Sequence, residues 1–198
     1  MIPTREDCLR LMVQYGMLEH IIDHSTAVAR VALFLSIKLN RKGQRIDLPL
    51  VEAAALLHDL TKTECLRTKE DHALTGSRLL KEIGYERIGD VVAEHIHLSK
   101  EMDPSLVSEE EVVNYADKRV RHDRIVSLEE RFEDLKGRYG KSERALELLE
   151  GLRRATFEVE RKIFSILKTD PDHLQDHLFE AGNGRRNGAS GGKSFLRD

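Results

Sequence analysis

Residues 50–59 have the sequence LVEAAALLHD, an apolar run that ends in His58 and Asp59. The run favours a buried helix that begins near Pro49, a residue suited to a first helical turn, and continues to Leu60. An imidazole and a carboxylate side by side at the end of such a helix are costly to bury unless something binds them. A divalent metal ion would bind both groups.

Two further residues extend this candidate site. His24 lies upstream on a segment with helical periodicity, and Asp117 lies downstream in the helical segment that follows Ser108. Because successive helical residues point about 100° apart, His58 and Asp59 can converge only on something small above the groove between them. A metal ion has that size, and the sequence presents a His, His-Asp, Asp set for it.

The remaining chain shows the spacing of amphipathic helices. Apolar residues recur at intervals of three, four and seven, which is the helical period. Thr4 and Asp71 resemble N-caps, and Ser108 with its Glu-rich first turn is typical of a capping box. Helices are expected over about residues 4–15, 19–39, 49–60, 71–84, 86–97, 108–118, 128–135 and 142–167. No strand-like alternation persists, so the expected fold class is all-α, a compact helical bundle with a long C-terminal helix.

Length and composition predict one domain with a tail. The chain has 198 residues, enough for one sizeable core, and no composition break divides it before the C-terminal end. Residues 1–170 are therefore expected to form the bundle. Residues 171–198 are rich in Gly, Arg, Asn and Ser, and such a segment buries too little apolar area to offset its ordering entropy. We expect this tail to be mobile.

The charge balance bears on the partners of the chain. Lys and Arg number 32 against 35 Asp and Glu, for a net charge of −3. No global basic field results, so nucleic acid is not expected as the main partner, whereas a small anionic substrate fits.

The cellular location is expected to be the cytoplasm. Cys8 and Cys65 lack the CxxC spacing of a zinc ribbon and form no disulfide framework. The first residues show no secretory signal pattern, and no stretch approaches the roughly 18 apolar residues of a membrane span. Neither secretion nor membrane insertion is expected.

Five ordered blocks of sequence carry a family resemblance. They are His24-Ser25-x-x-Val28-Ala29, Ala53-Ala54-Ala55-Leu56-Leu57-His58-Asp59-Leu60-x-Lys62, Asp71-His72-Ala73-x-x-Gly76-Ser77-x-Leu79-Leu80, Val91-Val92-x-x-His95 and Tyr115-Ala116-Asp117-Lys118. A lone His-Asp dipeptide is uninformative, but five blocks in this order are specific. With them, about residues 18–135 resemble the HD-domain superfamily of metal-dependent phosphohydrolases.

The resemblance implies a ligand set for a primary metal ion. The ligands would be His24, His58, Asp59 and Asp117, on different helices of a bundle, an arrangement in which inward-facing side chains commonly build metal sites. Nitrogen and oxygen ligands without thiolate suit manganese, iron, nickel, cobalt or zinc, and do not distinguish among them.

A second metal ion is also implied. Some members of the superfamily hold one with two further histidines, and His72 and His95 occupy the matching positions. The spacing of these ligands is similar to that in the symmetrical dinucleoside tetraphosphate hydrolases. The similarity to the HD-GYP phosphodiesterases is looser, because this sequence lacks their Gly-Tyr-Pro signature. The alternative is a site with one ion, in which His72 and His95 contact the substrate phosphate instead.

This ligand set predicts hydrolysis of a phosphoester or phosphoanhydride by a metal-activated water. The substrate would be a nucleotide or another small phosphorylated metabolite. Asp59 would bridge two ions or accept the proton of the water, and Lys62 would place a positive charge on a phosphate. Lys118, beside Asp117, is a second candidate for binding the substrate.

Three alternatives stay open at this point. One is symmetrical cleavage of diadenosine tetraphosphate. Another is a regulatory HD module that keeps its metal without turnover, although its usual sign, a lost ligand, is absent from this sequence. The stripe over residues 142–167 predicts either packing within the bundle or a coiled coil that would make the chain a homodimer. His122 is assigned no function.

Overall fold

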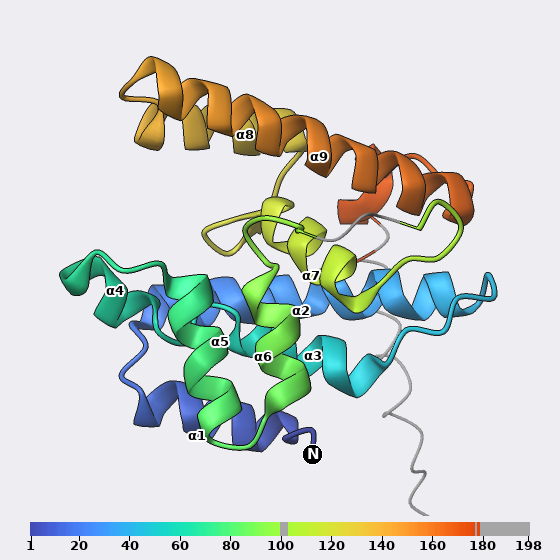
Figure 1. The fold of residues 1–198 in the computed structure, drawn as a ribbon. Helices are drawn as coiled ribbons and strands as arrows, with labels where there is room; N and C mark the ends of the chain where they lie inside the picture. The colour runs from blue at the N-terminus through green and yellow to red at the C-terminus, as the bar shows by residue number, and fades with distance from the viewer. Residues whose placement is uncertain (100–102, 177, 179–198) are drawn as a thin grey trace, which may run out of the picture.

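The computed structural model describes residues 1–99, 103–176 and 178, and it confirms the all-α class (Figure 1). The helices are α1 (Arg5–Gln14), α2 (Glu19–Asn40), α3 (Leu48–Leu57), α4 (Lys62–Thr68), α5 (His72–Glu82), α6 (Glu86–Ala93), α7 (Glu109–Lys118), α8 (Leu128–Tyr139) and α9 (Glu143–Leu167). Two short strands, β1 (Val120–Arg121) and β2 (Arg124–Ile125), pair antiparallel, and a 3-10 turn, η1 (Pro171–His173), follows α9.

The helix starts follow the predicted caps. At α7 the Ser108 hydroxyl accepts a hydrogen bond from the Glu111 N–H, and the Glu111 carboxylate accepts one from the Ser108 N–H. This reciprocal capping box satisfies two N–H groups that a helix start leaves unpaired. Asp71 caps α5 in a similar way, by accepting from two backbone N–H groups of its first turn.

The structure corrects the ends of three helices. Helix α3 ends at Leu57 instead of Leu60, so that residues 58–61 form a turn, and α6 ends at Ala93. Helix α8 continues to Tyr139. The short, polar α4 and the β1–β2 hairpin were not expected. A strand of two residues shows no alternation, and a helix of seven mostly polar residues shows little periodicity.

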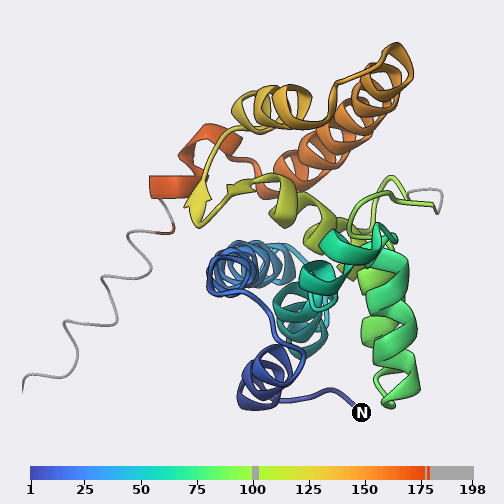
Figure 2. The ribbon, with the colours of Figure 1, turned by 90° about the vertical axis from the view of Figure 1, so that its left-hand side faces the viewer.

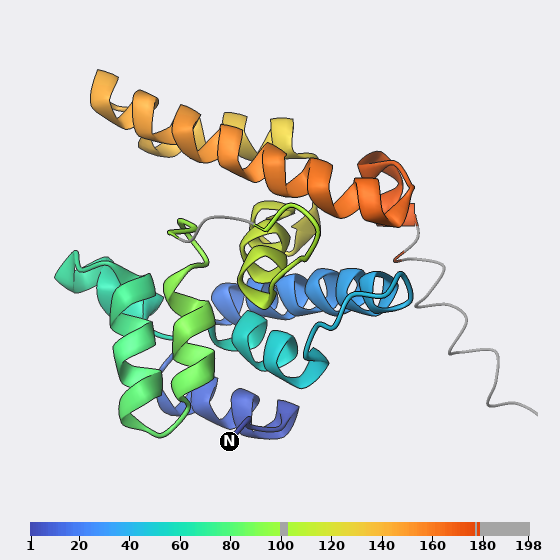
Figure 3. The same cartoon turned by 45° about the vertical axis from the view of Figure 1, so that its right-hand side comes forward.

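Helices α2 and α3 lie at the centre of the fold and pack on each other (Figure 1). The α5–α6 hairpin flanks them, and α1 covers α3 on the opposite side from α7 (Figure 2). Helix α7 packs on α2, and the α8–α9 hairpin forms an outer layer beyond α7 (Figure 3). Leu56 and Leu57, on α3, are fully buried in this core. Burial of each such side chain stabilises the fold by about 1.5–3 kcal/mol. This burial holds the end of α3, and the residues that follow it, in place.

Packing continues past residue 170. Leu174 and Leu178 are buried in the core, and the Arg119 guanidinium donates to the Pro171 carbonyl at 3.1 Å. Residues 179–198 of the expected mobile tail lie outside the described residues. In the part of the chain that is described, no helix combines the length and apolar character that crossing a membrane requires.

Candidate metal centre

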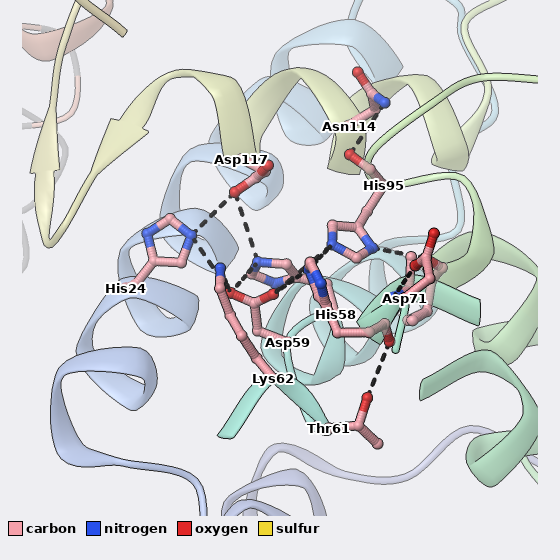
Figure 4. Close-up of polar contacts among 12 residues, drawn as sticks. His24, His58, Asp59, Thr61, Lys62, Asp71, His95, Asn114 and Asp117 are labelled. Atoms are coloured by element: carbon pink, nitrogen blue, oxygen red, sulfur yellow. Dashed lines mark hydrogen bonds and ion pairs between the residues drawn. The ribbon is translucent and has the colours of Figure 1, made fainter. Parts of the chain in front are cut away.

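Four of the predicted ligands meet where three helices converge (Figure 4). His24 comes from α2 and Asp117 from the last turn of α7, while His58 and Asp59 follow the end of α3. All four side chains are buried, and Figure 4 shows them pointing toward one another. The turn over residues 58–61 follows α3 directly, with the Leu60 N–H bonded to the Leu57 carbonyl, so both ligands are held at the end of the buried apolar run.

The distances among His24, His58 and Asp59 suit one cation, and Asp117 lies close to both of these histidines. The His24 Nε2 lies 3.0 Å from Asp117 Oδ1 and 4.0 Å from Asp59 Oδ2. The His58 Nε2 lies 3.4 Å from Asp59 Oδ2 and 3.7 Å from Asp117 Oδ1. Two ligands bonded to one ion at about 2.1 Å can be at most about 4.2 Å apart, so all four separations are compatible with a shared ion.

Asp59 also belongs to a second group of donors. Its Oδ1 lies 3.2 Å from the His72 Nε2 and 3.8 Å from the His95 Nε2, and the two imidazole nitrogens are 3.3 Å apart. The two oxygens of one carboxylate therefore face different sets of histidines. This His/Asp cluster can hold a divalent metal ion, and it offers donors for two.

Backbone carbonyls set the orientation of the rings. The Nδ1 atoms of His58 and His95 each lie 2.7 Å from the carbonyl oxygen three residues earlier, of Ala55 and Val92 respectively. A carbonyl oxygen only accepts, so each Nδ1 carries the hydrogen and each Nε2 presents its lone pair to the cluster. This is the arrangement that metal-binding histidines require.

His24 is held in the same way, but by a distant residue. Its Nδ1 donates to the carbonyl oxygen of His122 at 2.8 Å. His122 lies in the turn between β1 and β2 and has a φ of 56°, which aims its carbonyl at α2. Nothing in the sequence pointed to this role, because it belongs to a backbone atom and depends on the turn conformation.

Two buried polar atoms give an independent test of the fit. Among the described residues, neither the His58 Nε2 nor the Asp59 Oδ1 has a hydrogen-bond partner of acceptable geometry. A buried polar atom left unsatisfied costs about 1–3 kcal/mol. Both atoms belong to the donor groups and point into them, so a cation would satisfy both.

The charge states of the carboxyl groups favour a cation. Burial acts to raise the pKa of Asp59, but the charges of His58 and Lys62 outweigh it and hold the pKa well below its usual value. Burial likewise acts to raise the pKa of Asp117, and Lys118 with the His24 hydrogen bond holds it well below its usual value. Both groups are therefore carboxylates at neutral pH.

The imidazoles differ from one another. Burial, and then the nearby His58, lowers the pKa of His95 well below its usual value, which makes His95 a neutral donor. Burial acts to lower the pKa of His58 too, but the Asp59 carboxylate outweighs burial and raises it. A metal ion at this site would take the place of the His58 proton.

The two candidate lysines are placed differently. The Lys62 ammonium lies 2.7 Å from Asp59 Oδ2, and its side chain is about one-third exposed at the start of α4. The Lys118 ammonium is buried and donates to Asp117 Oδ2 at 2.9 Å and to the His95 carbonyl at 2.6 Å. Asn114, which the sequence did not single out, donates to the same carbonyl at 3.1 Å. Lys118 and Asn114 thus fix the position of His95.

A cavity of about 470 Å³ adjoins the cluster. Its polar end is lined by Asp59, Lys62, His72, His95, Asp117 and Lys118. His24 and His58 lie behind these residues, away from the cavity wall. The donor cluster therefore faces a space of the size that small-molecule sites occupy.

Comparison with known proteins places these residues in one family match. The family model described as "HD domain" matches residues 21–134, which is more than half of the chain and includes both donor groups. No solved structure matches the chain significantly.

Two curated relatives share part of the sequence. A protein of Thermoplasma volcanium named tRNA (cytidine(56)-2'-O)-methyltransferase is 33% identical over 96 residues, which are 48% of this chain and 26% of the relative. A protein of Picrophilus torridus with the same name is 30% identical over 145 residues, 65% of this chain and 40% of the relative. The chain spans less than half the length of either relative.

Proposed function

The chain belongs to the HD-domain family, and from this premise we propose that it is a metal-dependent phosphohydrolase. Its substrate would carry a phosphoester or phosphoanhydride, as a nucleotide or another small phosphorylated metabolite does. The observation that carries the proposal is the shared carboxylate of Asp59, whose two oxygens face separate groups of histidines beside an open cavity.

In this proposal His24, His58, Asp59 and Asp117 hold one ion, and Asp59, His72 and His95 hold a second. A divalent cation bound there would lower the pKa of a coordinated water and offset charge on phosphoryl oxygens. Asp59 would fix the spacing of the two donor groups, because each of its oxygens already faces one of them.

The lysines would act on the substrate and on the ligands. Lys62 is partly exposed and lines the cavity, so its ammonium can turn from Asp59 to a phosphoryl oxygen. Lys118 uses two of its three N–H donors on Asp117 and His95, which leaves one for the substrate. Lys62 would be the main phosphate contact, and Lys118 mainly a residue that positions the ligands.

The names of the relatives favour a second candidate. Both relatives are longer proteins named for tRNA methylation, so this chain could correspond to a metal-binding module that serves an RNA-modifying protein. Regulation without turnover would be one form of that role. The balanced charge of the chain still predicts that nucleic acid is not its main partner, and a cytoplasmic location remains part of our proposal.

Phosphate release from a substrate panel tests the proposal. Protein stripped of metal and reloaded with manganese, cobalt, nickel or zinc is assayed against nucleoside mono-, di- and triphosphates, diadenosine tetraphosphate and sugar phosphates. We expect release with at least one metal and a loss of more than about 100-fold in His58→Ala and Asp59→Ala, since each removes a ligand. His20→Ala, an exposed position on the same helix as His24, serves as control.

Two outcomes would count against this function. Full activity in both ligand variants would remove the metal mechanism. Metal binding without any phosphate release, together with tight binding of a tRNA transcript, would favour the module in an RNA-modifying protein.

A further inference from the structure

The cavity beside the metal centre has a second, apolar end. The residues that line it there are Cys65, Leu66, Leu135, Tyr139, Ala145, Leu148, Leu149 and Leu152. They come from α4 and from the α8–α9 hairpin, which forms the outer layer of the fold (Figure 3). One continuous cavity therefore joins a charged wall to a wall of leucines.

Several of these apolar side chains are unusually exposed. Leu66 is 56% exposed, Leu148 is 61% exposed and Tyr139 is 58% exposed. Single exposed leucines need no explanation, but three large apolar side chains around the mouth of one cavity indicate a surface that binds something. Ligand pockets are typically apolar with a few placed polar groups, as this one is.

Arg131 also lines this cavity and has an unused donor. Its side chain is only 12% exposed, and its Nη1 donates to Asp134 Oδ2 at 3.2 Å. Its buried Nε has no hydrogen-bond partner among the described residues. The other cations of the cavity wall, Lys62 and Lys118, are already bonded to ligand carboxylates.

The single carboxylate beside Arg131 is shared. Asp134 also receives the Arg138 Nε at 3.1 Å, and the Arg121 Nε lies 3.7 Å from it. Asp134 therefore faces three guanidinium groups, and of these Arg121 also pairs with Glu130 at 3.2 Å. Two carboxylates thus face three guanidinium groups, which leaves one positive charge in excess beside Arg131. A guanidinium with a free N–H is well suited to bind a phosphoryl group, because its planar fork matches the oxygens.

Six of the eight residues of the apolar wall lie beyond the segment that the family model matches. The match ends at residue 134, whereas α9, which supplies four of the wall residues, begins at Glu143. The C-terminal half of α9 buries Val159 and Ile163 in the core, but its N-terminal half presents Leu148 to the cavity mouth. The C-terminal half of α9 therefore packs in the core, and the N-terminal half lines the cavity.

We infer that Arg131 binds a phosphoryl oxygen of the substrate and that the α8–α9 leucines bind an apolar ring attached to that phosphate. This inference rests on the proposed function and narrows its substrate class to phosphates that carry a flat apolar group, as against bare sugar phosphates. The competing explanation of these exposed leucines is that a second protein binds to them. The continuity of the wall with the metal centre, within one cavity of about 470 Å³, favours a small molecule.

Two phosphonates test the inference by equilibrium binding. Phenylphosphonate and methylphosphonate carry the same charged group on a C–P bond that hydrolysis does not cleave. Only phenylphosphonate has a ring. Calorimetric titration of manganese-loaded protein should show phenylphosphonate binding about tenfold more tightly, the effect of burying roughly 50–60 Å² of apolar surface.

Matched variants assign this selectivity to residues. Leu148→Ser should lower the ratio of the two affinities about threefold and leave methylphosphonate unchanged, since part of one leucine contact is lost. Leu146→Ser, on the same helix but away from this cavity, is its control.

Arg131→Gln should weaken the binding of both phosphonates about tenfold, the effect of losing one charge-assisted hydrogen bond. Arg131→Lys should restore part of that loss. Arg144→Gln, an exposed arginine on α9 that does not line the cavity, should change neither affinity.

The outcomes separate this inference from the function on which it rests. Equal affinities for the two phosphonates, or an unchanged affinity ratio in Leu148→Ser, would overturn the inference that the apolar wall binds the ring. Unchanged affinities in Arg131→Gln would overturn the role of Arg131. In either case metal-dependent binding of methylphosphonate would leave the hydrolase proposal intact. Failure of metal-loaded protein to bind either phosphonate would reject the hydrolase proposal itself.

Discussion

The Nδ1 of His24 donates to the backbone carbonyl of His122, 98 residues away, at 2.8 Å. This bond makes Nδ1 a hydrogen-bond donor and places Nε2 3.0 Å from Asp117 Oδ1. A hairpin of only four paired residues thereby controls the orientation of a ligand on the central helix. The hairpin adds little to the core, but it is part of the site.

The turn conformation at His122 gives the first prediction. His122→Gly keeps a residue that adopts a φ of 56° easily, so the carbonyl stays in place. His122→Pro fixes φ near −65° and moves the carbonyl away from His24. We expect manganese affinity to fall about 10- to 100-fold in the proline variant and to change little in the glycine variant. Competition with a fluorescent chelator measures both, and equal affinities in the two variants would show that the carbonyl is unimportant.

Lys62 gives a prediction that separates metal binding from turnover. Its ammonium lies 2.7 Å from Asp59 Oδ2, where it competes with a cation for the carboxylate. Lys62→Met should therefore raise manganese affinity by about three- to tenfold, since a nearby like charge is removed. It should lower kcat/KM for phosphate release by about tenfold or more, because a phosphate contact is lost. Lys69→Met, an exposed position at the end of the same helix, is the control. Reduced metal affinity in Lys62→Met would contradict this assignment.

Metal removal should lower the thermal stability. Binding to the native state alone adds about 2.7 kcal/mol when the free metal is at 100 times its dissociation constant. For a chain of this size that corresponds to an increase in Tm of roughly 5–10 °C. Asp117→Ala, which removes one ligand, should abolish most of the increase, whereas Asp123→Ala, an exposed position in the hairpin turn, should keep it. Calorimetric scans with and without manganese would reveal an identical increase in both variants if Asp117 were not a ligand.

The two cysteines report on burial and on the cavity. Burial raises the pKa of Cys8 to about 12, so this thiol stays protonated near pH 8 and should resist alkylation in the native protein. Cys65 lines the cavity and should react first. Phenylphosphonate with manganese should slow the reaction of Cys65, as mass spectrometry of the labelled protein can measure. Labelling of Cys65 that this pair of ligands does not slow would argue against binding in the cavity.

The pKa of Cys8 also predicts a pH dependence of stability. Its folded pKa of about 12 lies above the ordinary value of 9.0, so the folded state holds the proton more tightly than the unfolded state. The contribution of the Cys8 proton to the stability of the folded state is therefore complete below about pH 9, and it is lost as the pH rises from 9 toward 12. Denaturant titrations should show a smaller loss over this interval in Cys8→Ala than in the original chain. Identical pH profiles would show that Cys8 does not titrate as described.

The sequence was most informative where chemistry is local. His58 and Asp59 are adjacent, and their position after an apolar run identified them, while the capping residues predicted the helix starts. The family resemblance then supplied His24, His72, His95 and Asp117 in order. His24, His72 and Asp117 lie on α2, α5 and α7, and His95 follows α6. Only packing brings His24 beside His58 and Asp59, and His72 and His95 beside the other oxygen of Asp59.

The sequence was least informative where function depends on tertiary contacts. Arg131 is one of many arginines in the chain, and nothing local separates it from Arg138. Asn114 and the His122 carbonyl act through bonds to segments distant in the chain. The early end of α3 was missed because Leu60 continues the apolar pattern although the α-helix ends at Leu57.

The central claim is that His24, His58, Asp59 and Asp117 surround one cation. Anomalous diffraction from crystals of manganese-loaded protein tests it most directly. We predict a peak about 2.0–2.3 Å from the Nε2 atoms of His24 and His58 and from one oxygen of each carboxylate, with a second peak near Asp59 Oδ1, His72 and His95 if two ions bind. A manganese peak remote from these residues, or none in fully loaded crystals, would contradict the account.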